Sequence, residues 1–453
     1  MFEKSFKMEI FVEKFGGASV NSSSAVRNVE KILKKETKKR LVVISAMGKT
    51  TNKLEVIVND WYNAKIFNES QYLEITKYHK QIIKDLFCEN NQADCSNNQA
   101  DDLNNQAEYC NNQVDRLLSQ LKDNIQTIAT NDYNFLYDQI VSFGEKISTT
   151  IISCYLNYKG IKNKLISSLE IIKTDNNYRD ANVNIELTQE ATDNIILPLL
   201  KEYDLVITQG FIGGTKENLV TTLGREGSDY SAGLLAHCLK AKSMTIWKDV
   251  PGLLNADPKR IEKTTKIISV PYSEAIELSY YGATIIHPKT IKPLENLNIP
   301  LYIKSFKDPN EQGTVICQSE SVNPIVPNYI FKDKQILLSI FPNDFSFATE
   351  TNISKIFSIL AKHKVKVNLM QNSAISFSVC FDENRNILPK LLEDLEEGFS
   401  VLYNTNLQLI TIRHYTEEAI KQQVFGKRIL VQQRSRITAQ FLVSNNISMV
   451  SAI

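Results

Sequence analysis

The sequence predicts an α/β protein in which a mostly parallel sheet lies between two layers of helices, followed by a smaller α+β region. Three observations support this prediction. Apolar strand-like runs alternate with helical segments through the first 320 residues, the pattern of a parallel sheet covered on both faces. Fourteen of the 16 glycines lie before residue 320, several of them directly after a strand-like run, where the backbone turns sharply. A proline-containing run at residues 322–327 reads as a connector, so we place a domain boundary near residue 325.

Each element of the large domain has its own signal. The strands are short apolar runs rich in Val, Ile and Phe, and two of the helices begin at a serine, Ser22 or Ser228. The predicted elements, in order, are a strand at 8–15, a helix at 22–35, a strand at 40–47, a long helical region at about 53–130, a strand at 204–214, a helix opened by Ser228 and Asp229, a strand at 242–250, a helix at 272–281 and a strand at 299–306. Ligands of such sheets bind at the carboxyl ends of the strands, so we expect the site there.

Length, charge and hydropathy exclude several classes of protein. With 453 residues, the chain is long enough for two or three domains. Its 52 Lys and Arg against 51 Asp and Glu give a net charge of +1, which provides no basic surface for nucleic acid. No apolar run approaches the roughly 18 residues of a membrane span, and the N-terminus lacks the features of a secretory signal. Seven cysteines without a CxxC pair indicate reduced thiols and no zinc site, so we expect a cytoplasmic protein.

A seven-residue repeat interrupts the long helical region. NNQAD at residues 90–94 recurs at 97–101, and related sequences follow at 104–108 and 111–115. This period places Ala or Val at one heptad position and Ser, Leu or Cys three residues later, which makes a weak helical seam. Two interpretations stay open: a partner-binding coiled coil, or a low-complexity insertion on a helix, which we favour because the seam has little apolar area. On the favoured interpretation, deleting residues 89–114 leaves activity intact.

Two loops after predicted strands have the composition of anion sites. Lys14 precedes adjacent Gly16 and Gly17, and such a turn before a helix offers backbone N–H groups to a phosphate while the lysine adds positive charge. The Walker A pattern GxxxxGK[ST] is absent, and a purely structural Gly-Gly turn remains an alternative. The second strand ends in a loop rich in hydroxyls and backbone donors that includes Ser45 and Thr51.

The region at residues 208–230 is the densest in glycine and hydroxyl residues. A strand runs into TQGFIGG, and the loop TTLGREGSDY opens a helix. Arg225 lies between glycines, where its guanidinium could bind a carboxylate through two hydrogen bonds, whereas Asp229 could be only a helix cap. Earlier, Glu145 stands near the start of an apolar helix, where a carboxylate ordinarily compensates the helix dipole. None of the five histidines stands in a triad or HExxH pattern, so nucleophilic or zinc hydrolysis has no support.

Taken in order, these segments resemble the aspartate kinases of the amino-acid-kinase family. The resemblance covers residues 8–316 apart from the repeat, and it rests on KFGGASV, VISAMGKTTN, SFGEKIST, TQGFIGG, TTLGREGSDYSAGLLA, WKDVPGLLNADP, GATIIHP and IPLYIKSFKDPNEQGT. It implies the three-layer amino-acid-kinase fold for residues 1–320, with the helical repeat inserted at about 88–118. Residues 330–453 resemble the family's ferredoxin-like regulatory ACT domains, with a first unit at about 330–402 and an abbreviated second unit at about 406–453.

The resemblance implies an ATP-dependent kinase that converts L-aspartate to 4-phospho-L-aspartate, the first step of lysine, threonine and methionine biosynthesis. Lys14 would stabilise the transferring phosphoryl group, and Asp229 would orient Lys14 rather than act as a base. Glu145 would bind the ammonium of aspartate and Arg225 its α-carboxylate. Aspartate would also contact Ser45, Thr51 and Ser228, and ATP, with Mg²⁺ on its phosphates, would contact Lys14, Gly16, Gly17, Lys248, Asp249, Leu254, Lys259, Thr284 and Ile285. No protein-held metal is expected, and the ACT region would form a homodimer and bind an amino-acid effector.

Several positions of the chain depart from the family's pattern. The family usually has Gly where Glu226 stands, Thr where Ala18 stands and Lys where Thr284 stands. Lys248 or Lys289 is the candidate to replace the missing cation, and we expect Glu226 to point to solvent.

The departures leave two further hypotheses open. A decayed kinase that serves as an amino-acid sensor or scaffold would fail to bind ATP, and a sister kinase would act on another carboxylate. In the tail, Asn368 and Ala374 stand where lysine-inhibited relatives have acidic residues, so lysine inhibition is not expected.

Overall fold

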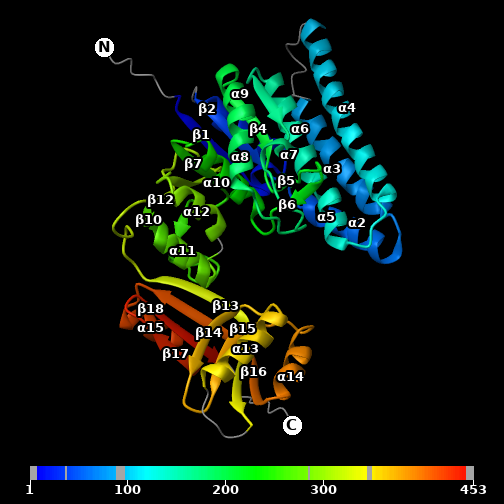
Figure 1. The fold of residues 1–453 in the computed structure, drawn as a ribbon. Helices are drawn as coiled ribbons and strands as arrows, with labels where there is room; N and C mark the ends of the chain where they lie inside the picture. Colours follow the sequence, from blue (N-terminus) through cyan, green and yellow to red (C-terminus); the bar gives the residue numbers. More distant parts are fainter. Residues whose placement is uncertain (1–7, 36–37, 88–96, 284–285, 344–348, 445–453) are drawn as a thin grey trace. The chain divides into compact units, whose positions relative to one another are not determined.

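The computed structural model describes residues 8–35, 38–87, 97–283, 286–343 and 349–444. They form two compact units (Figure 1). Described residues within 1–253, 266–276 and 285–323 make up the first unit, and those within 254–265, 277–284 and 324–453 make up the second. No helix in these parts of the chain combines the length and the apolar character that crossing a membrane requires.

The first unit is built on an eight-stranded sheet with the order β10-β12-β11-β7-β1-β2-β4-β3. Every neighbouring pair is parallel except β11 and β12, which confirms the predicted mostly parallel sheet. Its strands are β1 Ile10–Phe15, β2 Lys39–Ile44, β3 Asn163–Ile166, β4 Leu205–Gln209, β7 Ser243–Lys248, β10 Ser269–Pro271, β11 Leu301–Ser305 and β12 Thr314–Cys317. The short strands outside it are β5 Ile212–Gly214, β6 Val220–Thr222, β8 Leu253–Leu254 and β9 Lys266–Ile267.

Helices cover both faces of this sheet because alternate strand residues point to opposite sides. Phe15, Ile44 and Ile207 pack into one large core with α1 Ser23–Lys34, α2 Thr50–Ala64, α3 Glu69–Phe87, α4 Asn97–Thr127, α5 Tyr133–Val141 and α6 Phe143–Tyr158. On the other face, α10 Gly227–Cys238 packs against β1, β2 and β7 and contacts α8 Ile185–Ala191 and α12 Pro288–Glu295. The remaining helical segments are η1 Gly17–Val20, α7 Ser168–Ile171, η2 Thr192–Ile196, α9 Leu197–Glu202 and α11 Tyr272–Tyr281.

The predicted long helical region contains the three helices α2, α3 and α4, and the described part of the repeat, from Asn97 onward, lies on α4. Cys110 and Val114, both seam residues, are fully buried, and Ala107 and Leu117 are partly buried in the same core, which includes α3 and α6 residues. The seam residues before position 105 lie outside the described side chains. From Ala107 onward, therefore, the seam packs inside its own unit, which is not the arrangement of a partner-binding coiled coil.

Two deletions can test whether the buried later part of the repeat, which includes Cys110 and Val114, contributes more to stability than the earlier part. Removing residues 90–103, which are two seven-residue periods, should leave turnover and Tm unchanged. Removing residues 89–114 also deletes the buried Cys110 and Val114 and should cost about 2 kcal/mol or more of stability. Thermal unfolding and turnover of the two deletion variants check this expectation. Equal loss of activity in both would show that the early repeats are needed for function.

The second unit contains one antiparallel sheet of six strands with the order β14-β15-β13-β16-β18-β17. Two long strands, β13 and β16, pair along most of their length, and β16 crosses the position at which we expected the first small unit to end. Apolar residues of α13 and α14 form one core with the sheet, and α15 packs into another. The elements are β13 Asn328–Pro342, α13 Glu350–Lys362, β14 Val367–Asn372, β15 Phe377–Asp382, α14 Leu388–Glu396, β16 Phe399–Arg413, α15 Glu417–Val424, β17 Arg428–Arg434 and β18 Thr438–Ser444.

Candidate active site

The carboxyl ends of four neighbouring parallel strands meet at one edge of the first unit's sheet. Phe15 of β1 is in register with Ile44 of β2 and Trp247 of β7, and Ile44 is in register with Gln209 of β4. The loops after these strands and the start of α10 line a cleft of about 370 Å³, a volume typical of small-molecule sites. The cleft is lined by Lys14, Gly17, Ser45, Ala46, Gly48, Thr51, Glu145, Phe211, Gly224, Glu226, Gly227, Ser228, Asp229 and Lys248.

Two lysines converge on one buried aspartate in this cleft. The Nζ of Lys14, from β1, lies 2.6 Å from Oδ1 of Asp229, and the Nζ of Lys248, from β7, lies 3.5 Å from its Oδ2. Burial alone would raise the pKa of Asp229, but the two lysines lower it below the ordinary value, so the carboxylate is ionised at neutral pH. Asp229 therefore pairs with two lysines at the carboxyl edge of the sheet, and its lowered pKa makes it a weak proton acceptor.

The two glycine turns fit together too closely for any other residue. A Cβ on Gly17 would lie 2.9 Å from the carbonyl oxygen of Ala46, and the N–H of Gly48 donates a hydrogen bond to the carbonyl of Gly17. Gly48 has a φ of +56°, and a Cβ there would lie 2.7 Å from the hydroxyl of Tyr78. The turns thus bring bare backbone to the cleft beside Lys14, as an anion site requires.

Glu145 lies in the first turn of α6 and is 3% exposed. Its Oε1 accepts a hydrogen bond from the N–H of Ala46 at 3.2 Å, while its buried Oε2 has no hydrogen-bond partner among the described residues. Burial raises the pKa of Glu145 to about 8. A carboxylate that only compensates a helix dipole is normally exposed to water. The carboxyl of Glu145 is buried and has one unpaired oxygen among the described residues, so it is suited to bind a cationic group of a ligand.

The remaining predicted site residues divide into several groups. Arg225 is exposed and lines a neighbouring cavity of about 540 Å³ together with Arg179, Asp180 and Lys289, and the two cavities share Gly224. Gly16 is not among the residues that line the cleft, but a Cβ on it would lie 3.3 Å from the Nζ of Lys14. Asp249 and Lys259 are exposed, Leu254 and Lys259 belong to the second unit, and Thr284 and Ile285 lie outside the described residues.

Of the two lysines considered as a replacement cation, Lys248 lines the cleft. Lys289 instead forms an ion pair with Asp180 at 2.7 Å.

The expectation that Glu226 points to solvent is wrong. Its side chain lines the cleft, and its Oε2 is buried without a hydrogen-bond partner in the described part of the chain. The many glycines at residues 208–230 predict a loop, but they do not predict where the side chain of Glu226 points. That direction depends on the turn in which the N–H of Gly227 donates to the carbonyl of Gly224.

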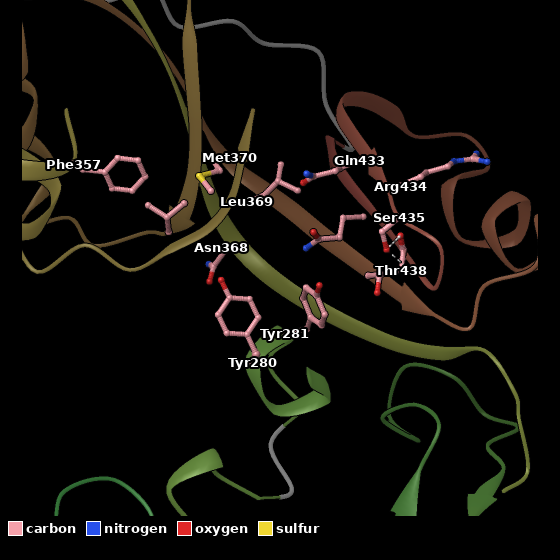
Figure 2. A pocket seen from close by; sticks show the side chains of 12 residues that line it. Tyr280, Tyr281, Phe357, Asn368, Leu369, Met370, Gln433, Arg434, Ser435 and Thr438 are labelled. Atoms are coloured by element: carbon pink, nitrogen blue, oxygen red, sulfur yellow. Dashed lines mark hydrogen bonds between the residues drawn. The ribbon is translucent and has the colours of Figure 1, made fainter. Parts of the chain in front are cut away.

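The second unit has a cavity of its own, of about 390 Å³ (Figure 2). Asn368 lies beside the ring of Tyr280, and the guanidinium of Arg434 extends away from both and pairs with Glu417. The amide of Asn368 donates to Gln335 and Asp382 and accepts from Lys332, so its hydrogen bonds are already used. The described residues that line the cavity include no carboxylate; they are Tyr280, Tyr281, Phe357, Val367, Asn368, Leu369, Met370, Gln433, Arg434, Ser435, Thr438 and Gln440.

The parallel sheet and the glycine turns with converging lysines at its carboxyl edge define a kinase of small molecules, and comparison with known proteins agrees. Residues 9–305 match the model of the amino acid kinase family, and the chain belongs to that family.

Within the family, the similar proteins are aspartokinases. The chain is 29% identical to the lysine-sensitive aspartokinase 3 of Escherichia coli, over 83% of this chain and 78% of that protein. It is 30% identical to the chloroplastic aspartokinase 3 of Arabidopsis thaliana, over 85% of this chain and 68% of that protein.

Solved structures agree over nearly the whole length. The crystal structure of E. coli aspartokinase III in complex with aspartate and ADP matches with a TM-score of 0.77 and 26% identity, and it covers 96% of each chain. The same enzyme in complex with lysine and aspartate matches with a TM-score of 0.77 and 27% identity, again over 96% of each chain. These matches include the antiparallel second unit and confirm the predicted fold class.

Proposed function

We propose that this protein is an aspartate kinase that transfers the γ-phosphoryl group of ATP to the β-carboxylate of L-aspartate. The observation that carries the proposal is the cleft itself. It holds Lys14 and Lys248, both paired with Asp229, and Glu145, whose Oε2 has no hydrogen-bond partner among the described residues. The lysines and the Gly17 turn suit phosphate oxygens, and Glu145 suits an ammonium. A nucleotide would bind with its phosphates at the lysines and the Gly17 turn, and an amino acid with its ammonium at Glu145.

The chemistry needs positioning and charge neutralisation rather than a base. The β-carboxylate of aspartate is ionised at pH 7, so one of its oxygens attacks the γ-phosphorus while the bond to the β,γ-bridging oxygen of ATP breaks, and no proton moves. Lys14 and Lys248 would stabilise the charge on the transferring group, and Asp229 keeps the two lysines in place. Mg²⁺ would arrive on the phosphates of ATP and neutralise part of their charge. The roles of Ser45, Thr51 and Ser228 toward aspartate stay predictions, as does that of Arg225.

Acceptor selectivity tests this proposal. Purified protein with ATP and Mg²⁺ should release ADP when aspartate is added, and not with glutamate, acetylglutamate or UMP. ADP release only with one of the other acceptors would support a sister kinase. Failure to bind ATP in calorimetry would support a decayed sensor.

Glu145→Gln should have opposite effects on binding and on stability. The variant loses the charge that would pair with the ammonium, so the Kd of aspartate should rise at least about tenfold. In the unfolded wild-type chain, the carboxyl of Glu145 loses its proton above pH 4.5, whereas burial in the folded protein raises its pKa to about 8. The wild-type carboxyl therefore lowers stability progressively between these two pH values and has no such effect below them. We expect the Tm of the variant to exceed that of the wild type at pH 8 and to equal it at pH 4.5.

For the second unit, we propose a homodimerisation role and the binding of an amino-acid effector without a cationic side chain. The absence of carboxylates among the described residues around the 390 Å³ cavity supports this choice of effector. We keep residues 1–320 as the catalytic domain and 330–453 as the regulatory region, and we place the enzyme in the cytoplasm.

A further inference from the structure

Glu226 has a conformation that its position in the fold does not explain. It precedes α10 with φ +55° and ψ +26°, in the left-handed region, which is uncommon for any residue but glycine. Its carbonyl accepts hydrogen bonds from Asp229 and Tyr230 and so starts the helix, a task that glycine would perform equally well. Its side chain makes no capping hydrogen bond. The carboxylate therefore has no structural use among the described contacts.

Neither lysine of the cleft forms an ion pair with Glu226 in the described part of the chain. The described lining residues include two lysines and three acidic side chains, and both lysines lie next to Asp229. Glu145 and Glu226 each have one buried carboxylate oxygen without a hydrogen-bond partner among the described residues. Such oxygens are costly unless a ligand donates to them. An α-ammonium carries three N–H donors, so a single group of the substrate could serve both carboxylates.

We propose that Glu226 is a specificity-determining residue that binds the α-ammonium of the amino-acid substrate together with Glu145. The inference deepens the proposed aspartate kinase activity and rests on it. These two acidic side chains would strengthen the binding of a substrate with a free ammonium and weaken the binding of a dicarboxylate that lacks one. The cleft would thereby separate aspartate from succinate, which differs from it by that one group.

Comparing aspartate with succinate tests this role. Calorimetry gives the Kd of aspartate and, by competition with aspartate, the Ki of succinate, for the wild type, Glu226→Gln and Glu226→Gly. Gln keeps the size of the side chain, and Gly accepts the observed φ, so both variants should fold. We expect the Kd of aspartate to rise about tenfold or more in both variants. The Ki of succinate should stay the same or fall, and kcat at saturating aspartate should change less than about threefold.

The controls separate this inference from the proposed function. Glu217→Gln changes an exposed glutamate on a nearby turn and should alter neither constant. An unchanged Kd of aspartate in the Glu226 variants, or equal weakening of aspartate and succinate, would overturn the assignment. Wild-type protein that binds aspartate but does not release ADP would refute the kinase activity, while the comparison of Kd values would still decide the role of Glu226.

Discussion

Lys14→Ala should lower kcat by about 10²–10³-fold or more, while the Kd of aspartate changes little. Lys14 is nearly buried at the carboxyl end of β1, and its ammonium is fixed 2.6 Å from Asp229. A charge that is already oriented stabilises the transferring phosphoryl group without reorganising during the reaction, and water in the space left by alanine could not do the same. Steady-state kinetics with varied ATP and varied aspartate measure the effect.

Lys80→Ala is the matched control for this variant. Lys80 pairs with Asp115 at 2.8 Å on the surface of the same unit, where both side chains are more than two-fifths exposed. Exposed pairs contribute about 0–1 kcal/mol, so this variant should keep the wild-type kcat and Tm. A folded Lys14→Ala protein that retains more than about a third of the wild-type kcat would contradict the role given to Lys14.

Asp229→Asn should reduce both stability and turnover. The variant keeps the shape of the side chain but leaves Lys14 and Lys248 facing each other without the anion between them. Loss of one partner from a buried ionic cluster costs about 3–5 kcal/mol, so Tm should fall by several degrees. Turnover should fall as well, since repulsion would displace the Nζ of Lys14 from its position. Thermal unfolding and kcat of Asp229→Asn, with Asp115→Asn as the surface control, check both effects.

The pH dependence of the wild-type kcat distinguishes this account from general acid–base catalysis. If Asp229 were a base, the wild-type rate would follow the titration of one carboxylate, whereas Tm falls in Asp229→Asn under either account because the variant loses both ion pairs. Because the pKa of Asp229 is low, we expect instead that the wild-type kcat shows no such titration near neutral pH.

The sequence was sufficient to predict the fold class and most of the cleft. Strand-end loops with adjacent glycines and a lysine are local patterns, and a parallel sheet brings the carboxyl ends of its strands together, so Lys14, Ser45 and Asp229 could be expected at one edge. The local pattern does not assign Glu145 to the cleft, because a glutamate in a first helical turn is usually a cap. Only its burial, which depends on how α6 packs against the loop at Ala46, distinguishes the two interpretations.

Features that depend on long-range packing were not predictable in the same way. The direction of the Glu226 side chain follows from a left-handed turn that favours glycine. The family's usual glycine at this position is compatible with such a turn, but it does not indicate where a glutamate side chain points. The repeat reads as an isolated seam, yet Cys110 and Val114 belong to the core of the first unit. Strand β16 continues through the expected boundary because it pairs with β13 from Asn328 to Pro342.

The central claim is that this cleft joins the phosphoryl group of ATP to the β-carboxylate of aspartate. Trapping the product with hydroxylamine and identifying the hydroxamate by mass spectrometry tests it most directly. The account predicts β-aspartyl hydroxamate in an amount equal to the ADP released, and its loss in Lys14→Ala. ADP release without a hydroxamate, or a hydroxamate at the α-carboxyl, would contradict it.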